Sequence, residues 1–259
     1  MANERQQRAA RAEQMRKERE KVERKQRNLI TVAIVGVVIA LIAVGGYAIN
    51  NTSKSNTPTG KYVAPPNLSD AANFGFDYTA VDAGGKAGKK PVTVALYEDF
   101  QCPICKSFEE GAPGAFLAQQ VKSGAITIQY RPFAFLNTSG NDHYSDRAAS
   151  AAMCVYEKGG AAAYKKFHDV LYANQPPEGG SGLTDSALIG YANQVGATGL
   201  KSCINTNKYV PWVVKAKAKG SAQGVSGTPT VMINGKIING ATGANSVPQA
   251  AELQKDISA

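Results

Sequence analysis

A short apolar strand pattern that runs into two closely spaced cysteines constrains this chain more than any other stretch. Residues Val92 to Leu96 are an apolar run typical of a buried strand, and Cys102-Pro103-Ile104-Cys105 opens the helical pattern that follows. A thiol at a helix N-terminus meets unpaired backbone N–H groups and the positive end of the helix, which stabilise its thiolate. Pro103 suits an early helical position because it has no N–H to lose there. The stretch predicts thiol–disulfide chemistry, with metal binding as the alternative.

A second apolar run, Leu29 to Ile49, is long enough to span a membrane. Its twenty-one residues carry no charge, and at about 1.5 Å per residue they just cross a hydrocarbon core. The run exceeds the roughly 7–15 residues of a signal-peptide core, so it predicts an uncleaved signal anchor rather than a cleaved signal peptide. Basic residues crowd its N-terminal side, and the positive-inside rule therefore places the N-terminus in the cytoplasm and everything after residue 50 outside.

Charge is concentrated at the N-terminus. Residues 1–28 hold ten Lys or Arg and five Glu, so they contribute more than half of the net charge of +9. The interleaved Glu side chains favour a solvated cytoplasmic tail over a nucleic-acid arm, and no nucleic-acid partner is expected. Residues 50–66, rich in Asn, Thr, Ser, Gly and Pro, predict a flexible stalk, and residues 67–259 the globular domain.

Within that domain, periodicity predicts strands that alternate with helices. Strands are expected at 76–81, 92–98 and 126–135, with a hairpin that turns at Asn234-Gly235. Helices are expected at 102–123, 146–158, 161–173, 184–195, 208–219 and 246–255. The order is strand, helix, strand, a block of helices over about 146–224, then a hairpin and a last helix.

This order resembles the thioredoxin fold with a helical insertion, here preceded by a single transmembrane helix. Cys102-Pro103-Ile104-Cys105 and Gly227-Thr228-Pro229 are its most specific elements, and Ser145-Asp146-Arg147-Ala148-Ala149 is a weaker match to the start of the insertion. The chain is most similar to DsbA-like extracytoplasmic members that are tethered to a membrane and carry a Tyr-Glu-Asp-Phe-x-Cys-Pro-x-Cys stretch. The resemblance covers about residues 68–257.

The resemblance implies a thiol:disulfide oxidoreductase in which Cys102 attacks and Cys105 resolves the mixed disulfide. It implies that Thr228-Pro229 is a cis peptide beside the cysteines, with the Thr228 backbone free to pair with an extended substrate. Pro103 and Ile104 would tune thiolate stability, because they are not the Gly-Pro of reducing thioredoxins. Oxidation of unfolded exported cysteine-containing proteins is the expected direction. The alternatives are reduction or isomerisation, a peroxide or maturation-specific reductase fed by a membrane electron carrier, and a non-catalytic substrate-binding module.

The resemblance also implies a re-oxidising partner, a quinone-linked membrane protein of the DsbB or VKOR-like type. No nucleotide or flavin fingerprint is present, so no cofactor is expected.

One departure from the family concerns proton handling. Thioredoxins and many relatives have a buried acid six residues before the first cysteine, where this chain has Leu96. Strand alternation places Glu98 on the same face as Leu96, so Glu98 is a candidate substitute. The alternative is that Glu98 and Asp99 are solvated residues at a strand end.

Two further cysteines, Cys154 and Cys203, stand singly and 49 residues apart. If Cys102 pairs with Cys105, these two are left to each other as a staple of the insertion, with a second, regulatory redox pair as the alternative. A structural zinc site usually needs two close-spaced ligand pairs, so no metal is expected. The only histidines, His143 and His168, are interpreted as surface or partly packed residues.

Overall fold

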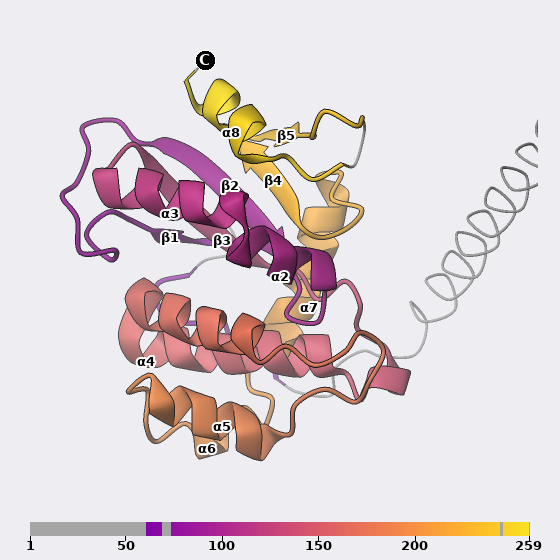
Figure 1. The fold of residues 1–259 in the computed structure, drawn as a ribbon. Helices are drawn as coiled ribbons and strands as arrows, with labels where there is room; N and C mark the ends of the chain where they lie inside the picture. Colours follow the sequence, from indigo (N-terminus) through magenta and orange to yellow (C-terminus); the bar gives the residue numbers. More distant parts are fainter. Residues whose placement is uncertain (1–60, 69–73, 244–245, 259) are drawn as a thin grey trace, which may run out of the picture. The chain divides into compact units, whose positions relative to one another are not determined.

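The computed structural model describes residues 61–68, 74–243 and 246–258, and its centre is a five-stranded mixed sheet (Figure 1). The strand order is β1-β3-β2-β4-β5, and β2 pairs in parallel with β3 and antiparallel with β4. The strands are β1 Phe76–Tyr78, β2 Val92–Glu98, β3 Ile126–Pro132, β4 Thr230–Ile233 and β5 Lys236–Ile238. Central β2 is buried on both faces from Val94 onward, as its apolar run predicts.

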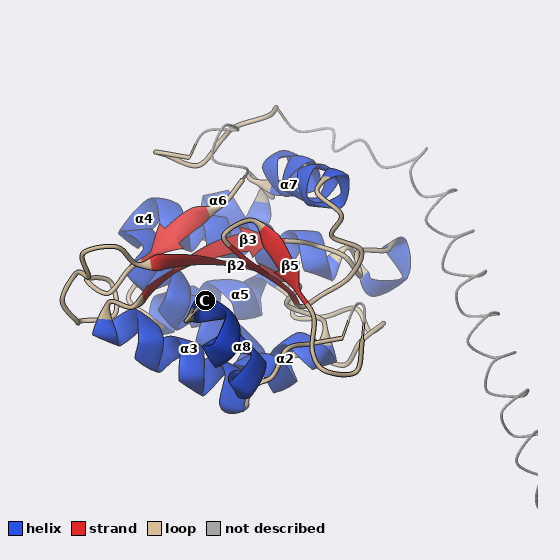
Figure 2. Cartoon of the chain, turned by 90° about the horizontal axis from the view of Figure 1, so that it is seen from above, coloured by secondary structure: helices blue, strands red, loops and turns tan. Residues whose placement is uncertain are grey.

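Helices cover both faces of this sheet (Figure 2). They are α2 Pro103–Glu110, α3 Ala112–Ser123, α4 Tyr144–Ala173, α5 Asp185–Gln194, α6 Lys201–Asn205, α7 Val210–Ala222 and α8 Ala250–Ile257, with a 3₁₀ turn, η2, at Ser139–Asn141. Helices α2, α3 and α8 lie on one face of the sheet and α7 on the other. Helices α4, α5 and α6 pack together beside the sheet as the helical insertion (Figure 1).

Helix α7 falls inside the span predicted for the insertion, 146–224, yet it packs directly on the sheet. A Cβ on Gly220 would lie 2.8 Å from the ring of Phe133, so glycine permits the close approach of α7 to the strands. Buried Ala95, Tyr97 and Met232 form the small core beneath it with Phe133. The insertion therefore ends before α7.

The prediction of a single helix over 102–123 is wrong, because the helical segment is interrupted at Gly111 and forms α2 and α3. Gly111 is extended (φ −93°, ψ −171°) and serves as the C-cap of one helix and the N-cap of the next. Pro113 lies in the first turn of α3, where its missing N–H leaves no hydrogen bond unmade. The break expected between the helices at 146–158 and 161–173 does occur, as a kink inside α4 where Gly160 has φ 70°.

The hairpin prediction is confirmed, while several element ends shift. Asn234 and Gly235 both have positive φ, 49° and 81°, as a tight two-residue hairpin turn requires. Strand β1 ends at Tyr78, β3 ends at Pro132, and α8 begins only at Ala250.

The expected transmembrane anchor, 29–49, and the tail, 1–28, lie outside the described residues. Over the described ranges, no helix combines the length and the apolar character that a bilayer crossing needs. Of the predicted stalk, only residues 61–66 are described. Tyr62, Val63 and Ala64 among them already pack against the core, so the packed chain begins earlier than residue 67.

Candidate active site

Two free thiols lie where β2 passes into α2. Cys102 is the N-cap of α2, with extended backbone (φ −78°, ψ 115°), and Cys105 lies one turn into the helix. Both residues are buried, Cys105 completely. The strand thus delivers Cys102 to the helix end, and the helical turn brings Cys105 back beside it.

The environment separates the acidities of the two thiols. A hydrogen bond from the Cys105 thiol is the main cause that lowers the pKa of Cys102 to about 6, and the backbone N–H groups of Ile104 and Cys105 add to it. Burial raises the pKa of Cys105 well above its ordinary value, and the nearby Glu98 carboxylate raises it further. Near neutral pH, Cys102 is therefore a thiolate and Cys105 a protonated thiol.

The Thr228–Pro229 peptide bond is cis and lies against Cys102. The Cys102 sulfur is 3.3 Å from the Thr228 carbonyl oxygen. A shallow hollow of about 240 Å³ continues from this peptide, with apolar Ile104 and Ile237 among its exposed lining residues. The hollow therefore lies next to the peptide that contacts the Cys102 sulfur.

The loop that precedes Cys102 is held by Asp99, which is buried rather than solvated as one interpretation expected. Its carboxylate accepts hydrogen bonds of 2.8 Å from the N–H groups of Gln101 and Leu136 and from the Ser145 hydroxyl. Burial raises the pKa of Asp99, and these donors oppose the shift. Asp99 therefore ties the cysteine loop to the beginning of α4.

Gln101, fully buried, fixes the same loop to a distant part of the insertion. Its Nε2 donates to the carbonyl oxygens of Pro177 and Gly180, and its Oε1 accepts from Asn141. Gln175 in turn donates to the carbonyl oxygens of Phe100 and Cys102. The insertion thus positions the reactive cysteine through the backbone that leads to it.

Glu98, the last residue of β2, is also buried. One carboxylate oxygen lies 3.1 Å from Nε2 of His168 on α4, and the other is buried with no hydrogen-bond partner in the described part of the chain. His168 is fully buried, so its interpretation as a surface or partly packed residue is wrong. His143 is half-buried and contacts Asn137.

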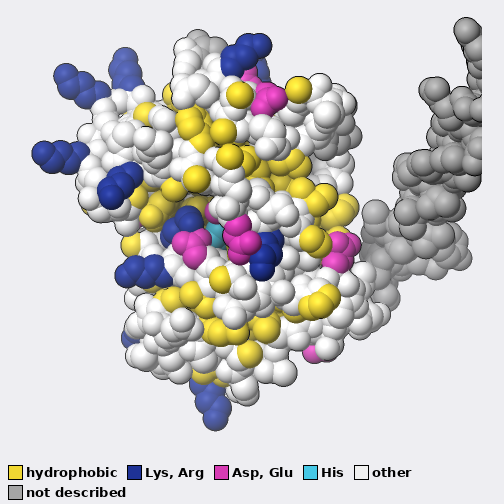
Figure 3. Space-filling model, viewed as in Figure 1, with side chains coloured by type: hydrophobic (Ala, Val, Ile, Leu, Met, Phe, Trp, Pro, Cys, Tyr) yellow, Lys and Arg dark blue, Asp and Glu magenta, His cyan; other side chains and the backbone are white. Residues whose placement is uncertain are grey.

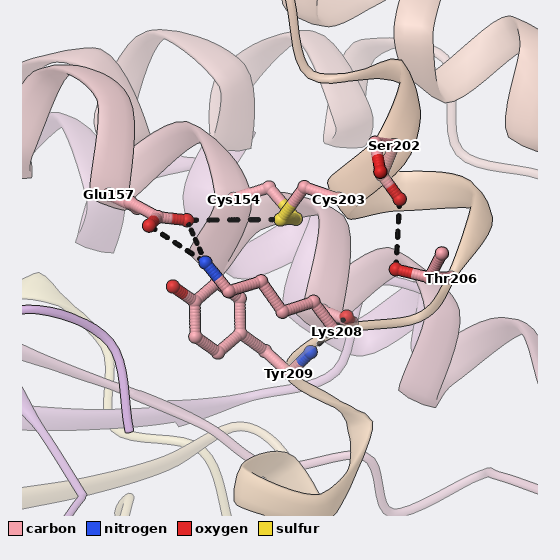
Figure 4. The surroundings of a disulfide bond; sticks show 8 residues. Cys154, Glu157, Ser202, Cys203, Thr206, Lys208 and Tyr209 are labelled. Carbon is pink, nitrogen blue, oxygen red and sulfur yellow. Dashed lines mark hydrogen bonds and ion pairs between the residues drawn. A yellow bond between two sulfur atoms is a disulfide. The ribbon is translucent and has the colours of Figure 1, made fainter. Parts of the chain in front are cut away.

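Cys154 on α4 and Cys203 on α6 form a disulfide (Figure 4). Nearby, Lys208 forms an ion pair with Glu157 at 2.8 Å, which links the same two parts of the insertion. The bond lies in the insertion and is separate from the Cys102 and Cys105 pair.

The structure gathers Cys102, Cys105, Thr228 and Pro229 at one place, with Pro103 and Ile104 in the first turn of α2. Glu98 is buried and close enough to Cys105 for its charge to raise the pKa of that thiol. Sequence reasoning missed the fixing roles of Asp99 and Gln101 and the contact of His168, since their partners lie far away in sequence. The periodicity of a helix or strand does not predict such contacts between distant residues.

Comparison with known proteins supports the chemistry of this site. The family model described as Thioredoxin matches residues 85–252. A probable disulfide bond formation protein D from Bacillus cereus is 24% identical over 174 residues, which cover 66% of this chain and 77% of that protein. The reduced disulfide bond oxidoreductase DsbG of Mycobacterium tuberculosis is 31% identical, with TM-score 0.58, covering 75% of this chain and 88% of the other. Reduced DsbA from the same organism is 30% identical, with TM-score 0.58, over 71% and 91% of the two chains.

Proposed function

Because this chain belongs to the thioredoxin family and is a DsbA-like thiol:disulfide oxidoreductase, we propose that it oxidises cysteines of exported proteins outside the cytoplasmic membrane. The observation that carries the direction is the stabilised Cys102 thiolate, with its pKa lowered to about 6. A stabilised thiolate favours the reduced protein, which makes the disulfide form a good electron acceptor.

In the proposed reaction, a substrate thiolate attacks Cys102 of the Cys102–Cys105 disulfide. A bond forms between the substrate sulfur and Cys102, the bond to Cys105 breaks, and Cys105 keeps the electron pair and takes up a proton. A second substrate thiolate then attacks the substrate sulfur of this mixed disulfide and releases Cys102 as a thiolate. The substrate loses two electrons and two protons; the electrons and one proton stay on the protein, and the other proton goes to solvent.

The cis Thr228–Pro229 peptide supports a role in substrate binding. Pro229 has no N–H to donate, and Thr228 presents its backbone beside Cys102. Exposed Ile104 and the adjoining hollow suit an apolar residue next to the substrate cysteine, while Pro103 begins the helix that stabilises the thiolate.

Glu98 is proposed to handle the proton of Cys105. It replaces the acid that the family usually has at the position of Leu96, and its unpartnered carboxylate oxygen is free to accept a proton. After burial, the charge of Glu98 is among the causes that raise the pKa of Cys105, which supports this role.

Cys154 and Cys203 are proposed to be structural rather than a second redox pair. Their bond joins two helices of the insertion, and neither sulfur belongs to the Cys102 site. Closing a loop of about fifty residues stabilises a fold by about 4 kcal/mol on the chain-entropy model.

An oxidant must pass its electrons on after each turnover. We propose a quinone-linked membrane protein of the DsbB or VKOR-like type as the acceptor, with residues 29–49 as a signal anchor that keeps both proteins in one plane. The sequence of that segment, uncharged between basic residues and a polar stretch, supports this placement. Alkaline extraction of membranes and protease protection in spheroplasts test it: release into the soluble fraction would contradict the anchor.

The direction of exchange is tested by the reduction potential of the Cys102–Cys105 pair and by refolding of reduced ribonuclease. We expect a potential more oxidising than that of thioredoxin, about −270 mV, and ribonuclease reactivation that Cys102→Ser abolishes. A potential at or below the thioredoxin value, with efficient insulin reduction, would favour the reductase alternative.

A further inference from the structure

Fully buried His168 links the cysteine site to the surface of the insertion. Its Nε2 lies 3.1 Å from Glu98 at the end of β2, and its Nδ1 lies 3.0 Å from Asp169. The Asp169 side chain is about half exposed, whereas those of Glu98 and His168 are buried. One imidazole therefore bridges a carboxylate beside Cys105 and a carboxylate that reaches water.

The charges around His168 favour its protonated form. Burial alone would lower the pKa of His168, but the carboxylates of Glu109, Asp169 and Glu98 raise it to about 9. Lys165 is the other cation in this cluster, and it pairs with Glu109 and Asp169. The titratable groups that face the ring are Glu98 from β2, Glu109 from α2, Tyr130 from β3, and Tyr164, Asp169 and Tyr172 from α4.

A groove opens this cluster to solvent. It has a volume of about 500 Å³, lies between α2, α3 and α4, and is lined by Glu109, Lys165 and Asp169 among others. Figure 3 shows acidic, basic and histidine side chains gathered in the middle of this face of the molecule. A proton that reaches Asp169 can therefore exchange with water.

At the other end of the link lies a buried thiol that must gain and lose a proton in every cycle. Cys105 accepts a hydrogen bond from the backbone N–H of Asp99, directly after Glu98, and the charge of Glu98 acts on it. One buried oxygen of Glu98 has no hydrogen-bond partner among the residues that the structure describes, so it is available to take part in a proton route.

We propose that His168 is a positioning residue for the exchange reaction: its imidazole holds the Glu98 carboxylate in place as the proton acceptor of Cys105 and connects that proton to the groove through Asp169. The inference rests on the proposed function and deepens it. When the Cys102–Cys105 bond breaks, the electron pair stays on Cys105, and a proton moves from the imidazolium through Glu98 to that sulfur. Water in the groove then restores the imidazolium proton. Resolution of a mixed disulfide runs the same transfer backwards.

A divalent cation is the rival occupant of this cluster. Ligand atoms of Glu98, Glu109 and His168 lie within 4.8 Å of one another, which suits a metal ion. The contacts favour protons instead, because His168 already faces Glu98 and Lys165 already faces Glu109. The experiment therefore includes a metal arm.

The test follows reduced protein as it reacts with excess nitrothiobenzoate disulfide, which releases a coloured thiol in each of two steps. Attack by Cys102 releases the first, and attack by Cys105 on the mixed disulfide releases the second. In His168→Gln, the amide cannot carry a proton between Glu98 and Asp169, so the link from Cys105 to the groove is cut. We expect the second step to slow about 10- to 100-fold at pH 7 with a changed pH profile, and the first to stay within about twofold.

Two variants keep the test decisive. Asp169→Asn, at a more exposed side chain, should slow the second step in the same direction but less, and it replaces His168→Gln if that variant does not fold. His143→Asn is the matched control, since Asn tolerates the positive φ of this residue, and it should behave as wild type.

Three outcomes overturn the inference: an unchanged second step and pH profile in both variants, an equal slowing of both steps, or stoichiometric Zn²⁺ binding by the disulfide form that His168→Gln abolishes. Calorimetric titration of the disulfide form with Zn²⁺ provides the last measurement, because its thiols are then blocked. If wild type itself shows no second release, the proposed function fails rather than the role of His168.

Discussion

The Cys102 sulfur lies 3.3 Å from the Thr228 carbonyl oxygen, although the two residues are 126 positions apart in the chain. The carbonyl lies beside the thiol without supplying positive charge. The pKa of Cys102 is lowered first by the hydrogen bond from Cys105, and then by the Thr228 side chain and the backbone N–H groups in the first turn of α2.

The reactivity of Cys102 should consequently rise with pH in the slightly acidic range, as its thiol ionises. We expect its alkylation rate by iodoacetamide to reach half its maximum near pH 6, because the pKa of Cys102 is lowered to about 6. Cys105→Ala removes the donating thiol and should move the midpoint upward. A midpoint near pH 9 in the unmodified protein would contradict this account.

The stability of the reduced form should depend on pH with a definite sign. The pKa of Cys102 falls from 9.0 to about 6 on folding, so its contribution is present above about pH 9 and is lost as the pH falls to about 6. The disulfide form has no such group. As the pH is lowered from 9 to 6, the melting temperature of the reduced protein should therefore fall relative to that of the oxidised protein. Differential scanning calorimetry on both forms measures this difference.

Glu98→Gln should change the pH dependence of the second thiol release in the assay above. An amide accepts no proton from Cys105, while removal of the charge lowers the pKa of that thiol, so both the rate and its profile change. Glu178→Gln, on an exposed loop, is the matched control. An unchanged profile would remove Glu98 from the mechanism.

Replacing both Cys154 and Cys203 by Ser should lower stability and preserve exchange. A loss of about 4 kcal/mol corresponds to a melting temperature about 10 °C lower for a domain of this size. Calorimetry and ribonuclease refolding, at a temperature where the variant stays folded, measure the two properties. Loss of refolding activity with unchanged melting would assign the bond a redox role instead.

Asp99→Asn should loosen the cysteine loop. The amide cannot accept from Gln101, Leu136 and Ser145 in the same geometry, and a buried donor is left unpaired, which costs about 1–3 kcal/mol. Urea denaturation measures this loss, and alkylation at constant pH should show a less protected Cys105. Wild-type values for both would mean that other contacts hold the loop.

Local patterns predicted the parts of this molecule that local physics decides. The apolar run of β2, the cysteine pair at the start of α2 and the Asn234-Gly235 turn each depend on neighbours within a few residues. Alternation along β2 also placed Glu98 on the inner face.

The residues of the insertion that contact Glu98 and the cysteine loop could not be predicted from local patterns. His168 lies 70 residues from Glu98, and the partners of Gln101 lie 40 to 79 residues away, so their contacts depend on how the insertion returns to the sheet. In the sequence, a buried acidic residue at the end of a strand gives the same pattern as a solvated one, and only its partner in the fold distinguishes them. The break at Gly111 was missed for a related reason, because the apolar spacing continues across it.

The Cys154–Cys203 bond has a consequence for how each molecule matures. A newly made chain carries four thiols, and two of them must surrender a pair of electrons before the insertion is closed. The chain therefore has to undergo disulfide formation itself before its insertion reaches full stability. Each copy carries one bond of the kind that its own Cys102–Cys105 pair can exchange, at a place in the fold apart from that pair.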